Sequence, residues 1–481
     1  MILDHLEPRS VFHCFELLSA IPRGSGNTKA VSDFCVRFAE ERGLEHYQDA
    51  LNNVIIIAPA APGYEDAPPV IVQGHLDMVC AVAPGCEKDM AREGLELFVE
   101  GDRIGARGTS LGGDDGAAVA MILALLDDPS LPRPRLEAVL TVDEETGMFG
   151  ARALDAAPLH GRTMLNLDSE AEGIFTVACA GGARVYLRWS PRRETVAALP
   201  LRLTVEGLRG GHSGVEIDKG RGNANILMGR LLRAVAAAAP LRLVSLSGGT
   251  ADNAIPCACA SEIAVAPEAA EAVYAAVDAF CGDVRRELAV TDPGVRIGVA
   301  PGTPGDVGAL TAEDSGRILN ALTLVPNGIQ SMSFALPGLP ETSLNLGMLT
   351  LEGAQAAMTF SVRSSVASRK RALIETLRCV AAVTGAEAEV SGDYPAWEYR
   401  ADSPLRERMT RVYRELFGTE PKVVAIHAGL ECGLLAEKLP GLDCVSIGPD
   451  MLDIHTASER MSISSMARTW EFVKAILRES R

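Results

Sequence analysis

The sequence has no long apolar run, no excess of basic residues and few aromatic side chains. No uninterrupted apolar stretch approaches the roughly 18 residues that a membrane-spanning helix needs. The 45 Lys and Arg stand against 63 Asp and Glu, a formal charge of −18, and this acidity disfavours a nucleic-acid backbone or an anionic membrane as a partner. The opening MILDHLEPRS places acidic side chains early, with no cationic segment before an apolar one, so we expect no signal peptide.

Paired cysteines are also lacking. The 11 cysteines are an odd number without any C-x-x-C spacing, and the nearest pair is Cys257 and Cys259. We therefore expect reduced thiols in a cytosolic protein rather than a disulfide scaffold. No G-x-G-x-x-G or P-loop sequence occurs, which excludes the common motifs that cradle phosphates.

What is present is an alternation of short apolar strands with helices. Two apolar-faced helical segments lie within residues 9–45, on either side of the turn PRGSGN. The elements predicted next are strands at 53–58, 70–73, 136–142 and 163–167 and an apolar helix at 116–126. Continuous apolar strands that alternate with helices predict an α/β domain with a mostly parallel sheet and helices on both faces.

The pattern changes near residue 183. From there to about residue 395 the sequence predicts alternating strands and two long helices, at 266–288 and 368–384. A segment beginning TADNAIP and one beginning TSLNLG match loosely, each followed by strands and a helix, which leaves a duplicated α+β unit and coincidence as equal alternatives. After Trp397 the βα alternation returns, so the simplest arrangement is one α/β domain interrupted by an inserted domain.

Acidic residues and histidines gather at the ends of the predicted strands, where open α/β sheets bind ligands. The five clusters are GHLDM (74–78), GGDDG (112–116), TVDEETG (141–147), NLDSE (166–170) and DIHTASE (453–459). Alone, each has an ordinary structural explanation, such as a helix N-cap, a solvated turn or a hydrogen-bonded surface pair. Together they supply the two imidazoles and three carboxylates that a pair of divalent metals needs, with one carboxylate shared.

Two further carboxylates adjoin this set. Asp77 follows His75 by two residues and so lies on the same face of a strand, where it can accept the second ring N–H of His75 and orient it. Glu144 is free of the metals, and it can take a proton from an attacking water and pass it to the leaving amine. The expected metal ligands themselves are His75, Asp114, Glu145, Asp168 and His455.

In this order and at these intervals, the five motifs resemble those of the di-zinc metallopeptidase superfamily of carboxypeptidases, deacylases and dipeptidases. The sequence is most similar to its aminoacyl-histidine dipeptidase branch, the carnosinase-like Xaa-His dipeptidases, over nearly the whole chain. The resemblance implies an α/β, phosphorylase/hydrolase-like zinc peptidase domain formed by residues 1–182 and 396–481. It also implies an inserted α+β lid domain at 183–395.

The resemblance assigns the metal ligands. His75 and Asp168 would bind one metal, and Glu145 and His455 the other. Asp114 would bridge the two. Zinc is the expected metal, with manganese and cobalt as alternatives, because the same nitrogen and oxygen ligands bind each of them.

The resemblance also identifies Asp77 as the orienting aspartate and Glu144 as the catalytic base. One position departs from the family pattern, since related sequences often have Asn where this chain has Asp115. We expect Asp115 to cap the helix that follows. Because this second carboxylate lies so close, Asp115 is also the alternative to Asp114 as the bridging ligand.

Three residues of the expected lid match substrate-binding positions of the family. His212, in the segment GGHSGVEI, would stabilise the oxyanion of the tetrahedral intermediate. Asn253 and Arg363 would bind polar groups of the substrate, and the guanidinium fork of Arg363 suits a terminal carboxylate. The structural alternatives are a turn amide for Asn253 and a surface ion pair for Arg363.

The segment HAGLECG places His427 and Glu431 four residues apart at the start of a predicted helix. They could form a second metal site, although a packing or supporting role is the favoured interpretation. The segment lacks the paired histidines of H-E-x-x-H, which excludes a zincin mechanism.

The motifs predict a hydrolytic site with two divalent metals, and the resemblance implies a cytosolic dipeptidase that hydrolyses Xaa-His and other dipeptides, with a lid that closes over the substrate. We expect no nucleic-acid or membrane partner. A homodimer through the lid is the expected assembly, and a single chain whose duplicated lid completes the site is its alternative. A deacylase of N-acyl amino acids would have identical ligands. A non-catalytic metal- or peptide-binding relic is the third hypothesis, which the intact Glu144 disfavours.

Overall fold

The computed structural model describes all 481 residues, Met1–Arg481, and they divide into two compact units. Unit 1 comprises Met1–Ala178, Tyr399–Ala425 and Leu430–Arg481, and unit 2 comprises Cys179–Glu398 and Ile426–Gly429. The sequence placed the boundaries at residues 182 and 395 and did not anticipate that Ile426–Gly429 belong to the second unit. None of the helices combines the length and the apolar character that crossing a membrane requires.

Unit 1 is built on a mixed sheet of eight strands in the order β1-β2-β6-β3-β7-β22-β8-β21. The four central strands β6, β3, β7 and β22 are parallel, whereas β1, β2 and β8 pair antiparallel toward the edges. The α/β class is confirmed, and the four central strands form a continuous parallel core. The strands are β1 (Glu45–Gln48), β2 (Val54–Ala58), β3 (Val70–His75), β6 (Leu136–Thr141), β7 (Thr163–Asn166), β8 (Ile174–Cys179), β21 (Lys422–Ile426) and β22 (Asp443–Ser446).

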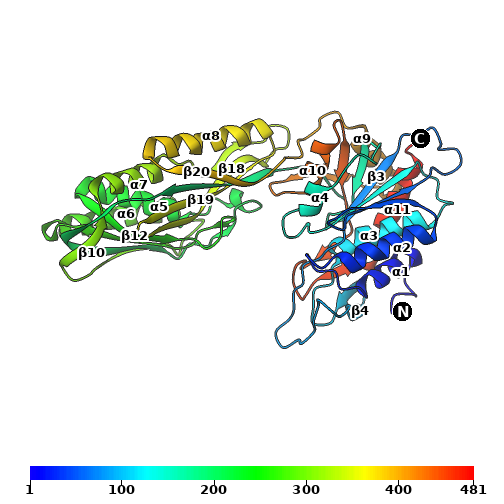
Figure 1. Ribbon diagram of the computed structural model, residues 1–481, viewed down its shortest axis with the longest axis horizontal. Helices are drawn as coiled ribbons and strands as arrows, with labels where there is room; N and C mark the ends of the chain where they lie inside the picture. The colour runs from blue at the N-terminus through cyan, green and yellow to red at the C-terminus, as the bar shows by residue number, and fades with distance from the viewer. The chain divides into compact units, whose positions relative to one another are not determined.

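Both faces of this sheet are covered, because every residue of β3 and β6 is buried. Helix α3 is apolar around its whole circumference and buried along nearly its entire length, packed against α1 and β3, as expected for a helix without a solvent face. The helices of unit 1, coloured from blue to red in Figure 1, are α1 (Arg9–Ser19), α2 (Lys29–Glu41), α3 (Gly113–Asp127), α4 (Phe149–Ala153), α9 (Pro404–Phe417), α10 (Glu431–Lys438) and α11 (Ile463–Arg478).

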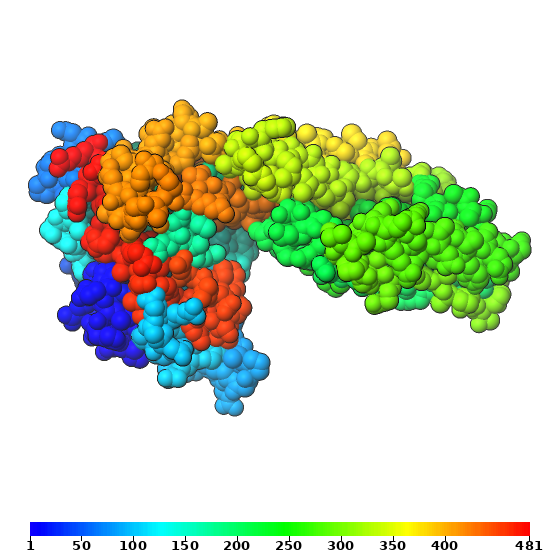
Figure 2. All heavy atoms as spheres, turned by 180° about the vertical axis from the view of Figure 1, so that it is seen from behind, coloured from blue at the N-terminus to red at the C-terminus, as the bar shows by residue number.

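A small antiparallel sheet joins the early and late parts of unit 1. Its order is β23-β24-β5-β4, and Met461 of β24 lies opposite Ile104 of β5. In Figure 2 the red C-terminal segments accordingly lie beside light-blue ones. The strands are β4 (Leu97–Glu100), β5 (Arg103–Ala106), β23 (Met451–Leu452) and β24 (Arg460–Ser462). This pairing holds the connection between β23 and β24, which carries His455, in unit 1.

Unit 2 is a ten-stranded antiparallel sheet with its helices on one face (Figure 1). In β9 the buried Val185, Leu187 and Trp189 alternate with the exposed Arg184 and Arg188, the pattern of a sheet with one solvated face. Its strands are β9 (Gly181–Trp189), β10 (Arg193–Glu206), β12 (Leu241–Gly248), β14 (Cys259–Val265), β15 (Arg296–Pro301), β16 (Gly305–Leu310), β17 (Gly328–Met332), β18 (Pro340–Glu352), β19 (Gln355–Ser364) and β20 (Glu387–Tyr394), and β11 (Gly211–His212) pairs separately with β13 (Ala254–Ile255).

Two of the four helices of unit 2 were not predicted. The expected pair is present as α6 (Ala270–Glu287) and α8 (Ala367–Thr384), whereas α5 (Ala224–Ala238) and α7 (Ala312–Leu324) are additional. Both additional helices carry N-cap signals in the sequence, since the Asn223 side chain accepts backbone N–H groups of α5 and the Thr311 hydroxyl accepts that of Asp314 in α7. Capping residues of these types could have revealed them. The duplication of two α+β units stays a prediction.

Candidate metal centre and its surroundings

The site lies at the carboxyl edge of the central parallel strands of unit 1. Strand β3 ends at His75, and its neighbours β6 and β7 end at Thr141 and Asn166. Since parallel strands present their carboxyl ends at one edge, the turn after β6 brings Glu145, and the turn after β7 brings Asp168, to the edge where His75 lies.

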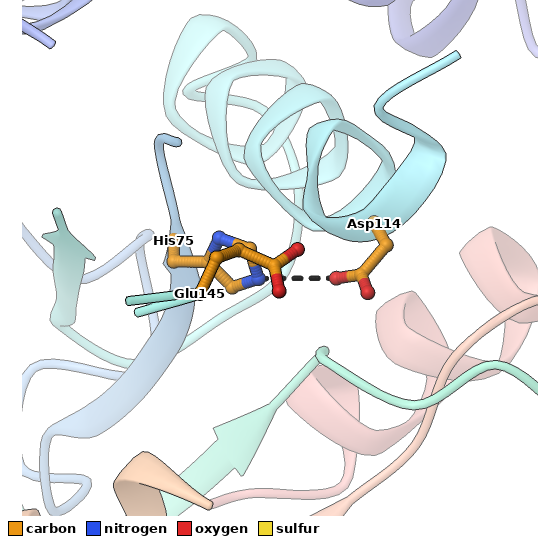
Figure 3. Close-up of side chains that lie close together, drawn as sticks. All are labelled: His75, Asp114 and Glu145. Atoms are coloured by element: carbon orange, nitrogen blue, oxygen red, sulfur yellow. Dashed lines mark hydrogen bonds and ion pairs between the residues drawn. The ribbon is translucent and has the colours of Figure 1, made fainter. Parts of the chain in front are cut away.

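Asp114, in the first turn of α3, lies between two imidazoles. Its Oδ1 is 3.0 Å from Nε2 of His75, and its Oδ2 is 3.1 Å from Nε2 of His455. Nε2 of His455 is also 3.0 Å from Oε1 of Glu145, and Nε2 of His75 is 3.7 Å from Oδ1 of Asp168. Figure 3 shows the side chains of His75 and Glu145 pointing into the same space as Asp114. The five side chains thus form two halves that share Asp114.

The charge balance of this cluster favours a bound cation. Hydrogen bonds to Asp114 and Glu145 raise the pKa of His455 to about 10, so these carboxylates draw positive charge to the site. Burial raises the pKa of Asp168 to about 6 despite its bond to His75. A divalent cation bound by neutral imidazoles would satisfy the same carboxylates. Ligand atoms of His75, Asp114 and Glu145 lie within 4.8 Å of one another, and this nitrogen and oxygen donor set fits a transition metal.

Asp115 does not cap helix α3, contrary to expectation. Its Oδ2 accepts the backbone N–H of His75 at 3.1 Å, and the first turn of α3 has no side-chain cap. Gly74 permits this approach, because a Cβ there would lie 2.6 Å from Oδ2 of Asp115. Burial and the charge of Asp168 raise the pKa of Asp115 well above its usual value. His75, Asp115 and Asp168 also offer atoms within 4.8 Å. However, the bond to the β3 backbone occupies Oδ2 of Asp115, whereas the two oxygens of Asp114 each face one imidazole, which favours Asp114 as the shared ligand.

Asp77 connects the imidazole of His75 to the turn after β6. It lies in the loop after β3 rather than on the strand, with Oδ1 3.4 Å from Nδ1 of His75. Its carboxylate also accepts the backbone N–H groups of Glu144 and Glu145, at 3.1 and 3.3 Å, and the Ser25 hydroxyl at 2.8 Å. Burial alone would raise the pKa of Asp77, but the interactions with His75 and these donors outweigh it and lower the pKa. Asp77 therefore orients His75 and the Glu144–Glu145 turn together.

Glu144 has the electrostatic surroundings of a proton acceptor. Burial raises its pKa well above the usual value, and the charges of Asp168, Glu431 and Glu145 add to this effect against the lowering influence of His75. A carboxylate whose pKa is raised is a stronger base than an ordinary carboxylate, which suits a group that accepts a proton and releases it again in one reaction cycle.

Backbone strain gathers beside the same side chains. Five residues other than glycine have a positive φ, and four of them lie near the site: Asp143 (54°), Met148 (57°), Asp453 (51°) and His455 (61°). Such conformations cost about 1–3 kcal/mol each and persist where the surroundings hold them. The strain in His455 and in the turn that carries Glu144 and Glu145 therefore suggests a functional requirement rather than a loop free to relax.

Two buried residues that the sequence did not single out hold the loop before α3. Glu459 accepts the backbone N–H groups of Leu111 and Gly112 on Oε2, at 2.8 and 2.9 Å, and that of Gly113 on Oε1 at 2.8 Å. Arg23 donates from Nη2 to the carbonyl oxygen of Gly112, and from Nη1 to those of residues 76 and 77 at 3.0 and 3.1 Å. Arg23 thus links the loops that carry the first imidazole and the shared carboxylate. Only the position of Glu459 within the DIHTASE cluster hinted at its role.

His427 and Glu431 do not form a joint site. Helix α10 begins at Glu431, so His427 precedes the helix instead of sharing a face with it. Oε2 of Glu431 accepts hydrogen bonds from Nε2 of Gln73 at 2.6 Å and from the hydroxyl of Thr141 at 2.5 Å. His427 instead contacts Ser343, and both of these residues belong to unit 2. The hypothesis of a second metal centre at this pair is wrong, because each side chain has a different partner.

The three candidate substrate residues all belong to unit 2. Nδ1 of His212 accepts the backbone N–H groups of Gly214 and Val215, each at 3.2 Å, so a neutral His212 carries its proton on Nε2, where it can donate. Asn253 lies in an exposed turn before β13, which leaves the turn-amide alternative open. Arg363 is only 9% exposed, and its burial contradicts the alternative of a surface ion pair.

The fold and the site together define an α/β protein with a partly buried imidazole–carboxylate centre at the carboxyl edge of its sheet and a large inserted antiparallel unit. Residues 71–479 match the model of peptidase family M20/M25/M40, and the chain belongs to this family. It is therefore an enzyme of the peptidase class.

Two relatives resemble the chain over its full length. It is 34% identical to the cytosol non-specific dipeptidase of Escherichia coli (strain K12), with 99% of each chain covered. It is also 34% identical to the solved aminoacylhistidine dipeptidase of Vibrio alginolyticus, with a TM-score of 0.94 over 99% of this chain and 98% of that one. The aminopeptidase PepT of Bacillus cereus shares the fold at 17% identity, with a TM-score of 0.57 and 99% of each chain covered.

Proposed function

We propose that this chain is a metal-dependent dipeptidase that hydrolyses Xaa-His and other dipeptides. The observation that carries the proposal is the placement of Asp114 between His75 and His455, with the raised-pKa carboxyl of Glu144 in the adjoining turn. Family membership and two full-length relatives that are both named dipeptidases support it.

The proposed metal ligands are the five residues of the centre. His75 and Asp168 would hold one ion and His455 and Glu145 the other, with Asp114 placed to serve both. Zinc is the proposed metal, with manganese or cobalt as substitutes, since this donor set does not discriminate strongly among them. When bound at these residues, the ions would supply Lewis-acid polarisation of the scissile carbonyl and would ease deprotonation of the attacking water.

The chain's own residues then carry the remaining steps. Asp77 fixes the orientation of His75 through Nδ1. Glu144 takes the proton of the attacking water and delivers it to the leaving amine. His212 donates its Nε2–H to the oxyanion that develops on the carbonyl oxygen. Asn253 binds a polar group of the substrate, and Arg363 binds its terminal carboxylate through the guanidinium fork.

Two alternatives make different predictions from the same ligands. An N-acyl amino acid amidohydrolase would require no free N-terminal amine, and a non-catalytic relic would bind metal without turnover. The names of both full-length relatives favour the dipeptidase. The intact Glu144 argues against a relic, because binding metal does not require an additional base.

We further propose that the enzyme works in the cytoplasm, as the name of the Escherichia coli relative states for that protein, and that it forms a homodimer through unit 2. Light scattering on the purified chain tests the assembly. A monomer at all accessible concentrations would favour the alternative in which one chain completes its own site.

The test of function is a substrate panel assayed with the zinc-loaded protein. The panel contains Ala-His, β-Ala-His, Ala-Leu, a tripeptide and an N-acetyl amino acid, and each is assayed with the wild type and with Glu144→Ala. Dipeptide cleavage that the substitution abolishes supports the proposal, with an expected loss of about 10²–10⁴-fold for a general base. Cleavage of the N-acetyl compound alone identifies a deacylase. Bound metal without any turnover identifies the relic.

A further inference from the structure

The short segment Ile426–Gly429 belongs to unit 2 although the chain on either side of it belongs to unit 1. The backbone N–H of Ala180 donates to the carbonyl oxygens of Ile426 and Ala428, at 3.2 and 3.0 Å. This anchoring places His427, in the middle of the segment, beside Ser343 near the beginning of β18.

His427 is buried with one ring nitrogen satisfied and the other without a partner. Its side chain is only 4% exposed, and Nε2 lies 2.7 Å from the hydroxyl of Ser343. Its Nδ1 is buried and has no hydrogen-bond partner. An unpaired buried polar atom is costly, and in a folded protein it calls for an explanation such as a ligand.

A second unpaired donor belongs to the residue opposite Ser343. Arg363 of β19 pairs across the strands with Ser343 of β18. Its Nη1 donates to the hydroxyl of Tyr394 at 3.3 Å, while its Nε is buried without a partner. None of the ion pairs of the chain involves Arg363. A buried guanidinium without an acidic neighbour lacks the counter-charge that such groups otherwise have.

His427 and Arg363 therefore bring donor and cationic groups together without a paired anion, whereas the carboxylate of Glu216 accepts the backbone N–H of His212. Burial, Arg363 and His212 together lower the pKa of His427 to about 4, so its imidazole is neutral at pH 7. The pKa of His212 is lowered by burial and by Arg363 as well. If the Ser343 hydroxyl donates to Nε2, the proton of neutral His427 resides on Nδ1, and the unpaired atom is a donor.

We propose that His427, through Nδ1–H, binds the free C-terminal carboxylate of the dipeptide together with Arg363, and that Ser343 holds the required tautomer. The inference rests on the proposed dipeptidase function and extends it to a residue that makes the enzyme select substrates ending in a carboxylate. A carboxylate offers two oxygens to two donors, whereas a C-terminal amide presents a donor of its own and leaves one of them unpaired.

Two substitutions separate the two ring nitrogens. His427→Asn retains an N–H donor near the position of Nδ1 but loses the contact with Ser343. His427→Gln retains a polar group near Nε2 but has nothing at Nδ1. The assay compares kcat/KM for Ala-His with that for the same dipeptide carrying a C-terminal amide, and the preference for the acid is the ratio of the two.

We expect His427→Gln to reduce the preference for the acid at least about tenfold, mainly through a higher KM for the acid. His427→Asn should keep most of the preference even if its overall activity falls. If the role of His427 is purely structural, kcat/KM should fall equally for the acid and the amide, and the ratio of the two should stay unchanged in both variants. That result would overturn the inference.

A binding measurement separates this inference from the proposed function. Calorimetry with zinc-loaded Glu144→Ala, with and without His427→Gln, compares the affinities for Ala-His and its amide. The proposed function fails if the wild type hydrolyses no dipeptide. The carboxylate site still stands in that case if the protein binds the acid more tightly than the amide only when His427 is present. Equal affinities for acid and amide when His427 is present refute the site regardless of activity.

Discussion

Replacement of Glu459 by Gln should loosen the loop that holds the shared carboxylate. Glu459 is 2% exposed and accepts three short backbone bonds, from Leu111, Gly112 and Gly113. In Glu459→Gln the amide oxygen can keep the first two as neutral bonds. The amide nitrogen then faces the N–H of Gly113, so that two donors oppose each other.

The magnitude follows from these three bonds. Losing one charge-assisted bond costs about 1.5–3 kcal/mol, and weakening the other two costs about 0.5 kcal/mol each. Removing a buried charge near Asp114 offsets part of this, because burial raises the pKa of Glu459. We expect a net loss of about 2 kcal/mol in the unfolding free energy of the metal-free protein. Displacement of Asp114 should also weaken metal binding by about 10–100-fold.

Urea denaturation in the presence of a chelator measures the first quantity, since bound metal would add its own stabilisation. Competition with a chelating dye measures the second. The matched control is Glu471→Gln on α11, whose side chain is 61% exposed and pairs with Lys474, and it should change either quantity little. If the metal-free stability and the metal affinity of Glu459→Gln both equal those of the wild type, the loop does not depend on this carboxylate and the reasoning is refuted.

Two further predictions concern packing and pH. Gly74→Ala should lower the unfolding free energy by about 1–3 kcal/mol, because the new Cβ would lie 2.6 Å from Oδ2 of Asp115. The control Gly316→Ala in α7, where a Cβ meets nothing within 4 Å, should instead raise the unfolding free energy by about 0.5–1 kcal/mol. Equal effects of the two substitutions in urea denaturation would contradict the packing argument. The lowered pKa of His427, about 4, lies below its value of about 6.5 in the unfolded chain, so the unfolded state binds the proton first as the pH falls. Between about pH 6.5 and pH 4 the unfolding free energy of the wild type should therefore fall by about 3 kcal/mol more than that of His427→Gln. Urea denaturation of both proteins across that interval measures the difference. Parallel pH profiles would show that His427 titrates normally.

The secondary structure of unit 1 was predictable because its signals are local. Apolar runs marked β2, β3 and β6, and the all-apolar segment after the paired aspartates marked α3. Helices α5 and α7, which were not predicted, lie in unit 2 among many strand-like segments, and their clearest local signals are the capping residues Asn223 and Thr311. The antiparallel edges of the first sheet were not predicted, because strand direction depends on which segments become neighbours.

The sequence by itself determined which side chains could hold a cation. His75 ends strand β3, and Glu145 and Asp168 lie in the turns after β6 and β7. Parallel strands present their ends at one edge whatever the rest of the chain does. The residue types and their order were therefore enough to propose the chemistry.

Only the tertiary structure decided how these side chains are held. Asp115 bonds to the backbone of His75 across 40 positions, and Glu459 to that of Gly113 across 346. His427 meets Ser343 across 84 positions and belongs to a different unit from Glu431, four residues later. A sequence pattern reports what neighbours along the chain favour, whereas these bonds exist because packing within each unit brings segments that are distant in sequence within hydrogen-bond distance.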